Sequence, residues 1–184
     1  MASNAALLLV LLAAEGATLL RVRQLISPHV FLGMVLIPPV LVKLGSTGYR
    51  FARYYLGAPA YRRKGPPPVL LRLLGPVVVI LTVVVLASGV ALLLAGPAWS
   101  ARLLFVHKAS FVLWFFAMTV HVLGHLAEVA RLAPGDWLRR TRRDVRGAGR
   151  RQWLIAASLV AGVLLGLATL SRVGPWLALA RVGH

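Results

Sequence analysis

The sequence predicts an all-α integral membrane protein in which four transmembrane helices form a bundle and a fifth lies beside it. Apolar residues make up 59% of the 184 residues, and they gather in continuous blocks of about 20, the length that spans a bilayer. The 21 Lys and Arg residues, against 4 Asp and Glu, lie mostly at the ends of these blocks. In a soluble chain a net charge of +17 would suggest nucleic acid. Arginines at the ends of apolar blocks instead orient a membrane protein, so we expect the lipid bilayer and no nucleic acid as partner.

Five apolar blocks are predicted to form a single transmembrane domain without internal repeats. The first has no basic segment in front of it, so we expect a retained helix and not a cleaved signal peptide. The second opens at Ser27-Pro28, an N-cap followed by proline at the first helical position, and Pro38-Pro39 should kink it. A Gly-Pro-Pro-Pro segment breaks the chain before the third block. The spans cover residues 5–22, 28–45, 69–95, 102–130 and 152–171, with loops at 46–68 and 131–151.

The positive charges predict the orientation of this multi-pass chain in the cell membrane. Fifteen of the 21 Lys and Arg residues fall in or beside the loops at 46–68 and 131–151. Cytoplasmic loops carry such an excess, so we expect the N-terminus inside and the C-terminus outside. The aromatic and basic segment 51–61 is expected to lie as a helix on anionic headgroups, with docking of a cytoplasmic partner as the alternative.

Four histidines lie within the apolar blocks or at their edges: His29, His107, His121 and His125. An ionisable side chain is expensive inside a membrane and indicates function by default. His107 and His121 are 14 residues apart, which at about 100° per residue leaves them about 40° apart around the helix. His125 follows His121 by one turn, so one stripe of the fourth block carries all three.

His29 and His107 are predicted to lie at the same depth in the membrane. Each lies about 10 to 12 Å outside the midplane of its block, so two imidazoles on neighbouring helices can bind one haem iron from opposite sides. Gly33, four residues after His29, leaves the same face of the helix open for close approach of a ring. The alternative is two interfacial histidines hydrogen-bonded to water or headgroups. The absence of cysteine excludes attachment of a c-type haem.

A minority of the basic residues lies on the outer side, against the positive-inside bias. Arg21, Arg23, Arg102 and Lys108 cluster in sequence beside His29 and His107. We expect some of them to bind haem propionates or an acidic partner. Ordinary snorkelling to the interface is the alternative.

The inner part of the membrane holds a second group of titratable residues. His121, His125 and Glu128 form a ladder one turn apart that could bind a quinone and move its protons. The alternatives are ligation of a second haem by His121 with an unconventional ligand or one from a partner, a metal site, and interhelical hydrogen bonding. Glu15, near the middle of the first block, is either a proton relay or a carboxyl group that is protonated or hydrogen-bonded across helices.

The histidine pattern resembles the cytochrome b561-like membrane subunits of bacterial respiratory enzymes, which include the formate dehydrogenase gamma subunit and the cytochrome b of nickel–iron hydrogenase. The resemblance covers about residues 5–130 and rests on His29 opening the second block and on the segments that begin His107-Lys-Ala-Ser-Phe and His121-Val-Leu-Gly-His. It implies an outer b-type haem held by His29 and His107. The inner haem of that family would use His121 and a histidine of the first helix, which this chain lacks. We therefore expect one haem b, with a second left open.

The resemblance also implies the function. Family members pass electrons between an outer-face oxidoreductase and the quinone pool, so we expect an electron-transfer subunit with an outer-face partner subunit and quinone as its reaction partners. Whether the chain itself oxidises or reduces quinone, and whether it forms a homodimer, is left open. The alternative is a haem-free membrane anchor or a small proton-coupled transporter that uses the histidine stripe and Glu15.

Overall fold

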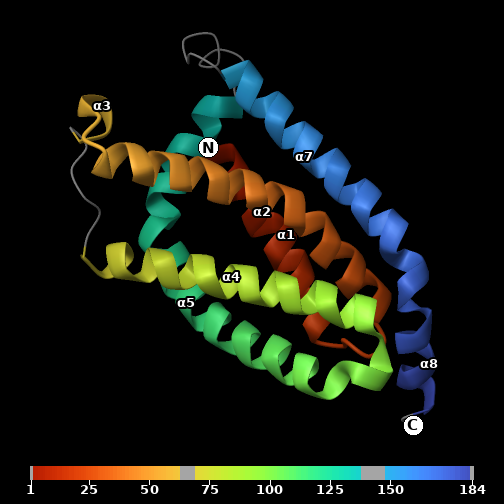
Figure 1. Cartoon of the computed structure of the whole chain (residues 1–184). Helices are drawn as coiled ribbons and strands as arrows, with labels where there is room; N and C mark the ends of the chain where they lie inside the picture. The colour runs from red at the N-terminus through yellow and green to blue at the C-terminus, as the bar shows by residue number, and fades with distance from the viewer. Residues whose placement is uncertain (1, 63–68, 138–147, 183–184) are drawn as a thin grey trace.

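The computed structural model describes residues 2–62, 69–137 and 148–182, and within these ranges the chain is helical with no strand, which confirms the all-α prediction (Figure 1). The long helices are α1 (Ala2–Leu19), α2 (Ile26–Tyr55), α4 (Val69–Ala95), α5 (Ser100–Trp137) and α7 (Ala148–Thr169). The short ones are α3 (Pro59–Arg62), η1 (Pro97–Trp99), η2 (Leu170–Val173) and α8 (Gly174–Val182).

Four helical segments are long and apolar enough to cross a membrane, as predicted for four of the five blocks. They are Ile26–Tyr55, Val69–Ala95, Ser100–Gly124 and Gly149–Leu179. The apolar part of α1, Ser3–Leu19, is shorter. At 1.5 Å per residue it spans roughly 26 Å, less than a hydrocarbon core of about 30 Å, so a fifth membrane crossing stays a prediction.

Helix α2 is longer than the sequence suggested. It continues past residue 45 to Tyr55, which takes in the first five of the eleven residues expected to lie on the membrane surface. The chain then turns at Gly57, whose φ is 87°. Pro38 and Pro39 lie inside α2 without ending it. Proline has no N–H, so the carbonyl oxygens four residues earlier lose their helical donors.

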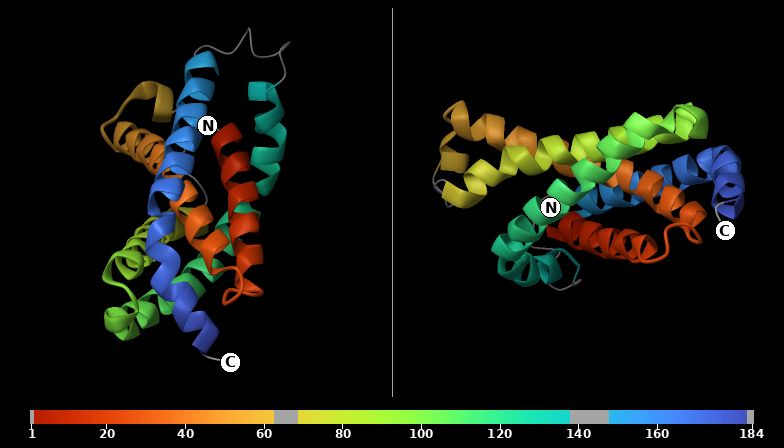
Figure 2. Two further views of the ribbon diagram at one scale, coloured as in Figure 1. Left: turned by 90° about the vertical axis from the view of Figure 1, so that its right-hand side faces the viewer. Right: turned by 90° about the horizontal axis from the view of Figure 1, so that it is seen from below.

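Two antiparallel hairpins build the bundle, α1 with α2 and α4 with α5, and α7 packs along α2 (Figure 1). In the α4–α5 hairpin the indole Nε1 of Trp114 donates to the Thr82 hydroxyl at 2.9 Å. In the α1–α2 hairpin the buried Asn4 amide donates to the Pro39 carbonyl oxygen at 3.1 Å. The two hairpins meet where α1 contacts α5 and α2 contacts α4 (Figure 2).

The two ends of the bundle differ in what they carry. The N-terminus, α3 and the start of α7 lie at one end, whereas the α1–α2 connection, η1 and α8 lie at the other (Figures 1 and 2). We call these the N-terminal end and the hairpin end. His29, in the first turn of α2, and His107, two turns into α5, are both near the hairpin end.

Close packing of α7 on α2 depends on two glycines one turn apart. A Cβ on Gly162 would overlap the carbonyl oxygen of Val35, and one on Gly166 would come within 2.7 Å of the Phe31 ring. The same carbonyl oxygen of Val35 receives no helical hydrogen bond, because Pro39, four residues later, has no N–H. Small residues at such positions let helix backbones approach in membranes, where packing rather than the hydrophobic effect holds helices together.

Replacement of Gly162 by alanine is expected to destabilise the protein by about 1–3 kcal/mol, because the methyl group forces α7 away from α2. Thermal unfolding of the protein in detergent measures the effect. Gly16→Ala is the matched control, since a Cβ there meets nothing within 4 Å and alanine favours the helix. Equal melting temperatures for Gly162→Ala and wild type would contradict the packing.

Candidate cofactor site

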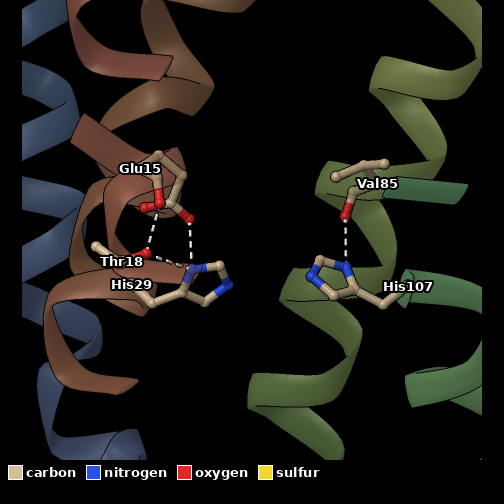
Figure 3. Close-up of polar contacts among 5 residues, drawn as sticks. All are labelled: Glu15, Thr18, His29, Val85 and His107. Carbon is tan, nitrogen blue, oxygen red and sulfur yellow. Dashed lines mark hydrogen bonds and ion pairs between the residues drawn. The ribbon is translucent and has the colours of Figure 1, made fainter. Parts of the chain in front are cut away.

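His29 and His107 face each other across the bundle near the hairpin end (Figure 3). Their ring centroids are 6.4 Å apart, and the ring planes meet at 80°, so the rings are not stacked. Each ring uses its Nδ1 in hydrogen bonds on its own side, and Figure 3 shows the other nitrogen, Nε2, of each ring directed toward the opposite ring. The structure thus brings together His29 and His107, which the sequence predicted to lie at the same depth in the membrane.

On the α1–α2 side, Glu15 and Thr18 hold His29. Its Nδ1 lies 2.9 Å from Oε1 of Glu15 and 3.0 Å from the hydroxyl oxygen of Thr18. The Thr18 hydroxyl donates its own proton to the backbone carbonyl oxygen of Glu15, so toward His29 it accepts. Two acceptors at Nδ1 fix the proton there, which leaves the lone pair of a neutral imidazole on Nε2.

On the α4–α5 side, the backbone of α4 holds His107 in the same tautomer. Its Nδ1 lies 3.1 Å from the carbonyl oxygen of Val85 and 3.0 Å from the Ser88 hydroxyl. Ser88 donates to the same Val85 carbonyl at 3.0 Å. A carbonyl only accepts, so Nδ1 of His107 carries the proton and Nε2 the lone pair. Gly89 makes room for the ring, because a Cβ there would be 3.2 Å from Cε1 of His107.

The distance between the rings fits a single metal ion between them. A metal–imidazole bond is about 2.0 Å, and a ring nitrogen lies about 1.15 Å from the centroid of a five-membered ring with bonds of about 1.35 Å. Two imidazoles on opposite sides of one ion therefore have centroids about 6.3 Å apart. The 6.4 Å between His29 and His107 matches this value.

The number of ligands indicates which kind of metal centre fits. Within the described residues no group of three or more His, Asp or Glu side chains could hold a metal ion. A bare zinc ion takes three or four protein ligands. A haem iron has its four equatorial positions filled by the porphyrin and needs only two axial ligands from the protein. The His29–His107 pair therefore offers as many ligands as a haem takes from the protein and fewer than a bare zinc ion takes.

Glu15 lies in this site and bonds from α1 to His29 on α2, which agrees with the interhelical hydrogen bond that the sequence left open, whereas its role as a proton relay stays a prediction. Its side chain is 15% exposed, Oε1 bonds to His29, and Oε2 is buried without a hydrogen-bond partner in the described part of the chain. Gly33, predicted to face the cofactor, faces Glu15 instead, since a Cβ there would be 3.7 Å from Oε1. Thr18, Ser88 and Gly89 belong to the site but carried no signal of their own in the sequence.

The four cations that the sequence predicts on the outer side lie on the surface of the hairpin end. Arg21 and Arg23 lie in the exposed α1–α2 connection and line a surface hollow of about 400 Å³, and Arg102 and Lys108 are exposed on α5. Among the side chains that the structure describes, Glu15 is the single acidic one, and it pairs with His29. Binding of propionates by these cations stays a prediction.

The inner ladder is described only in part. His121 is half-buried on α5, three residues before Gly124, which packs against Leu71 of α4. The side chains of His125 and Glu128 lie outside the described residues, so the quinone, proton and metal hypotheses for the ladder stay predictions. Helix α1 contacts α5 but contains no histidine that could serve as a second ligand opposite His121.

No protein-family model, curated protein or solved structure matches this chain at a significant level, so the site rests on its own geometry.

Proposed function

We propose that this membrane protein is a b-type cytochrome, in which His29 and His107 hold one haem as axial ligands. The observation that carries the proposal is the 6.4 Å between the two ring centroids, with both Nδ1 atoms engaged elsewhere and both Nε2 atoms directed inward. Hydrogen bonding of the distal nitrogen of a metal-bound histidine to a carboxylate or a backbone carbonyl fixes tautomer and orientation. Here Glu15 and Val85 make these two kinds of bond.

Held by His29 and His107, a haem would supply one-electron transfer. The protein holds the two imidazoles in place, because α1 and α4 each fix the Nδ1 atom of one ring. The desolvated carboxylate of Glu15 and the neutral carbonyl of Val85 make the two ligands electronically unequal, since a charged acceptor draws the His29 proton more strongly. The chain thus acts as an electron carrier and needs a donor and an acceptor.

The charges suggest where the donor and the acceptor lie. The end of α2, the short helix α3 and the first turns of α4 and α7 lie toward the N-terminal end of the bundle, away from the histidine pair (Figure 1). These elements carry six arginines: Arg50, Arg53, Arg62, Arg72, Arg150 and Arg151. By the positive-inside rule this end is cytoplasmic, and the haem lies near the outer face. We propose that an outer-face oxidoreductase subunit exchanges electrons with the haem and that membrane quinone is the other partner.

The visible spectrum of the purified protein tests the proposal. Protein produced with full haem supply is expected to show a Soret band and, on dithionite reduction, the sharp α-band of low-spin haem b, because two imidazoles give a strong axial field. Added carbon monoxide should leave the spectrum unchanged, since both axial positions are filled. Protein that folds under these conditions but shows no Soret band would refute the cytochrome.

One observation favours a second function, a small proton-coupled transporter. A carboxylate and an imidazole 2.9 Å apart within the apolar part of the bundle are the groups that proton-handling membrane proteins use. The same spectrum separates the two functions. A haem-free protein that acidifies the lumen of proteoliposomes in response to a membrane potential would favour the transporter.

A further inference from the structure

A second candidate ligand site lies at the N-terminal end of the bundle, far from the histidines. A groove of about 750 Å³ opens between α2 and α7, with Val42, Gly45 and Arg50 on one wall and Arg150 and Leu154 on the other. Figure 1 shows α2 and α7 diverging toward this end. Arg50 is 21 residues after His29 on α2, which is roughly 30 Å along the helix. The groove is therefore separate from the proposed haem.

The groove is strongly positive. Three arginines line it, Arg50, Arg150 and Arg151, and none of the residues that line it is acidic. The Nε of Arg50 donates to the carbonyl oxygen of Ser46 at 3.3 Å, which holds its guanidinium along α2 beside the groove.

The first turn of α7 adds to this field. It has no acidic residue, although the N-terminus of a helix carries a partial positive charge that an acidic side chain would stabilise. Arg150 and Arg151 instead bring two further positive charges to this turn. An anion in the groove would offset both the arginines and the helix dipole.

The remaining walls are apolar, which restricts the kind of anion. Val42 and Leu154 line the groove beside the arginines, and their helices continue from there into the membrane-spanning segments. Trp153 next to the groove is 78% exposed and Tyr49 on its wall is 59% exposed, as is typical of aromatic residues at the membrane–water interface. A ligand that complements both the arginines and the apolar walls of the groove has an anionic head and an apolar tail.

We propose that this groove binds an anionic phospholipid, with its phosphate on Arg50, Arg150 and Arg151 and an acyl chain along Val42 and Leu154. Guanidinium groups bind phosphate oxygens in bidentate pairs, and basic pockets between transmembrane helices at the cytoplasmic side hold such headgroups. A neutral quinone headgroup would bring no negative charge to the arginines that line the groove. A free phosphate would leave the apolar walls unused. The proposal does not depend on the haem.

Lipid binding by the full-length protein in a neutral detergent tests the site. Phosphatidylglycerol is titrated against phosphatidylcholine and inorganic phosphate, and native mass spectrometry counts bound lipid while thermal unfolding reports stabilisation. The test variant replaces Arg50, Arg150 and Arg151 by glutamine. The matched control replaces Arg53, Arg62 and Arg72 by glutamine, which removes the same charge at the same end of the bundle but outside the groove.

Wild type and control are expected to bind phosphatidylglycerol saturably and to melt at higher temperature with it, and the test variant is expected to bind it on the order of tenfold or more weakly. Equal losses in the two variants would overturn the site in favour of general charge attraction. Stabilisation of the wild type by inorganic phosphate as strong as by phosphatidylglycerol would overturn the lipid in favour of a free anion. Saturable binding of polyglutamate without binding of lipid would overturn it in favour of an acidic protein segment.

Discussion

His107→Ala is expected to remove the haem from this protein, and His29→Ala to do the same. In the proposed site each histidine would supply one of the two axial bonds, so an alanine at either position would leave an open coordination site and a cavity in an apolar bundle. The residual single bond would not hold a low-spin haem through purification. The haem-to-protein ratio, measured as the pyridine haemochrome against protein concentration, should fall to near zero in both variants.

Two further variants separate ligation from folding. His107→Met places a thioether, which is also an axial haem ligand, at the same position, and it is expected to restore part of the haem content with a raised midpoint potential. His121→Ala is the control on the same helix and should retain the wild-type ratio, because no histidine of α1 stands opposite it. Full haem content in both His29→Ala and His107→Ala would refute the pairing. Loss of half the haem in His121→Ala would show a second haem.

Residues at equal distances before and after a hairpin connection lie at the same level along its two helices. The levels of His29 and His107 could therefore be predicted from the sequence. In the α4–α5 hairpin, Ser88 lies as far before the connection as His107 lies after it, and Thr82 and Trp114 stand in the same relation. In the α1–α2 hairpin, Glu15 and His29 lie at nearly equal distances from the connecting loop. Applied to the sequence, this symmetry would have found Ser88 and Glu15 as partners of the two histidines.

Other features of the fold could not be predicted from the sequence. Which helix neighbours which is a property of the assembled bundle, so nothing in the sequence alone indicated that α7 packs on α2 through Gly162 and not on α4. The length of α2 was missed because two glycines, Gly45 and Gly48, suggested that the chain leaves the membrane there, whereas the helix continues to Tyr55. Gly33 was assigned to the cofactor because it shares a face with His29, but α1 lies against that face.

We expect Glu15 to tune the redox potential of the proposed haem through its hydrogen bond to His29. Its Oε1 accepts the Nδ1 proton of His29 at 2.9 Å, and its Oε2 has no hydrogen-bond partner in the described part of the chain. A hydrogen bond to a charged acceptor is stronger than one to a neutral acceptor by about 1 kcal/mol. It increases the electron donation of the imidazole, which favours the oxidised iron, and the carboxylate charge acts in the same direction.

Glu15→Gln should therefore raise the midpoint potential of the haem while leaving its content unchanged. A hydrogen-bond difference of about 1–1.5 kcal/mol sets an upper limit of about 40–65 mV on the shift of a one-electron couple, because part of the bond's strength is the same in both oxidation states. Potentiometric titration of the α-band measures the shift. Ser88→Ala is the matched control, because His107 loses a neutral partner but keeps the Val85 carbonyl, and its potential should stay within about 15 mV of wild type. An unchanged potential in Glu15→Gln with full haem content would mean that the carboxylate does not act on the iron through His29.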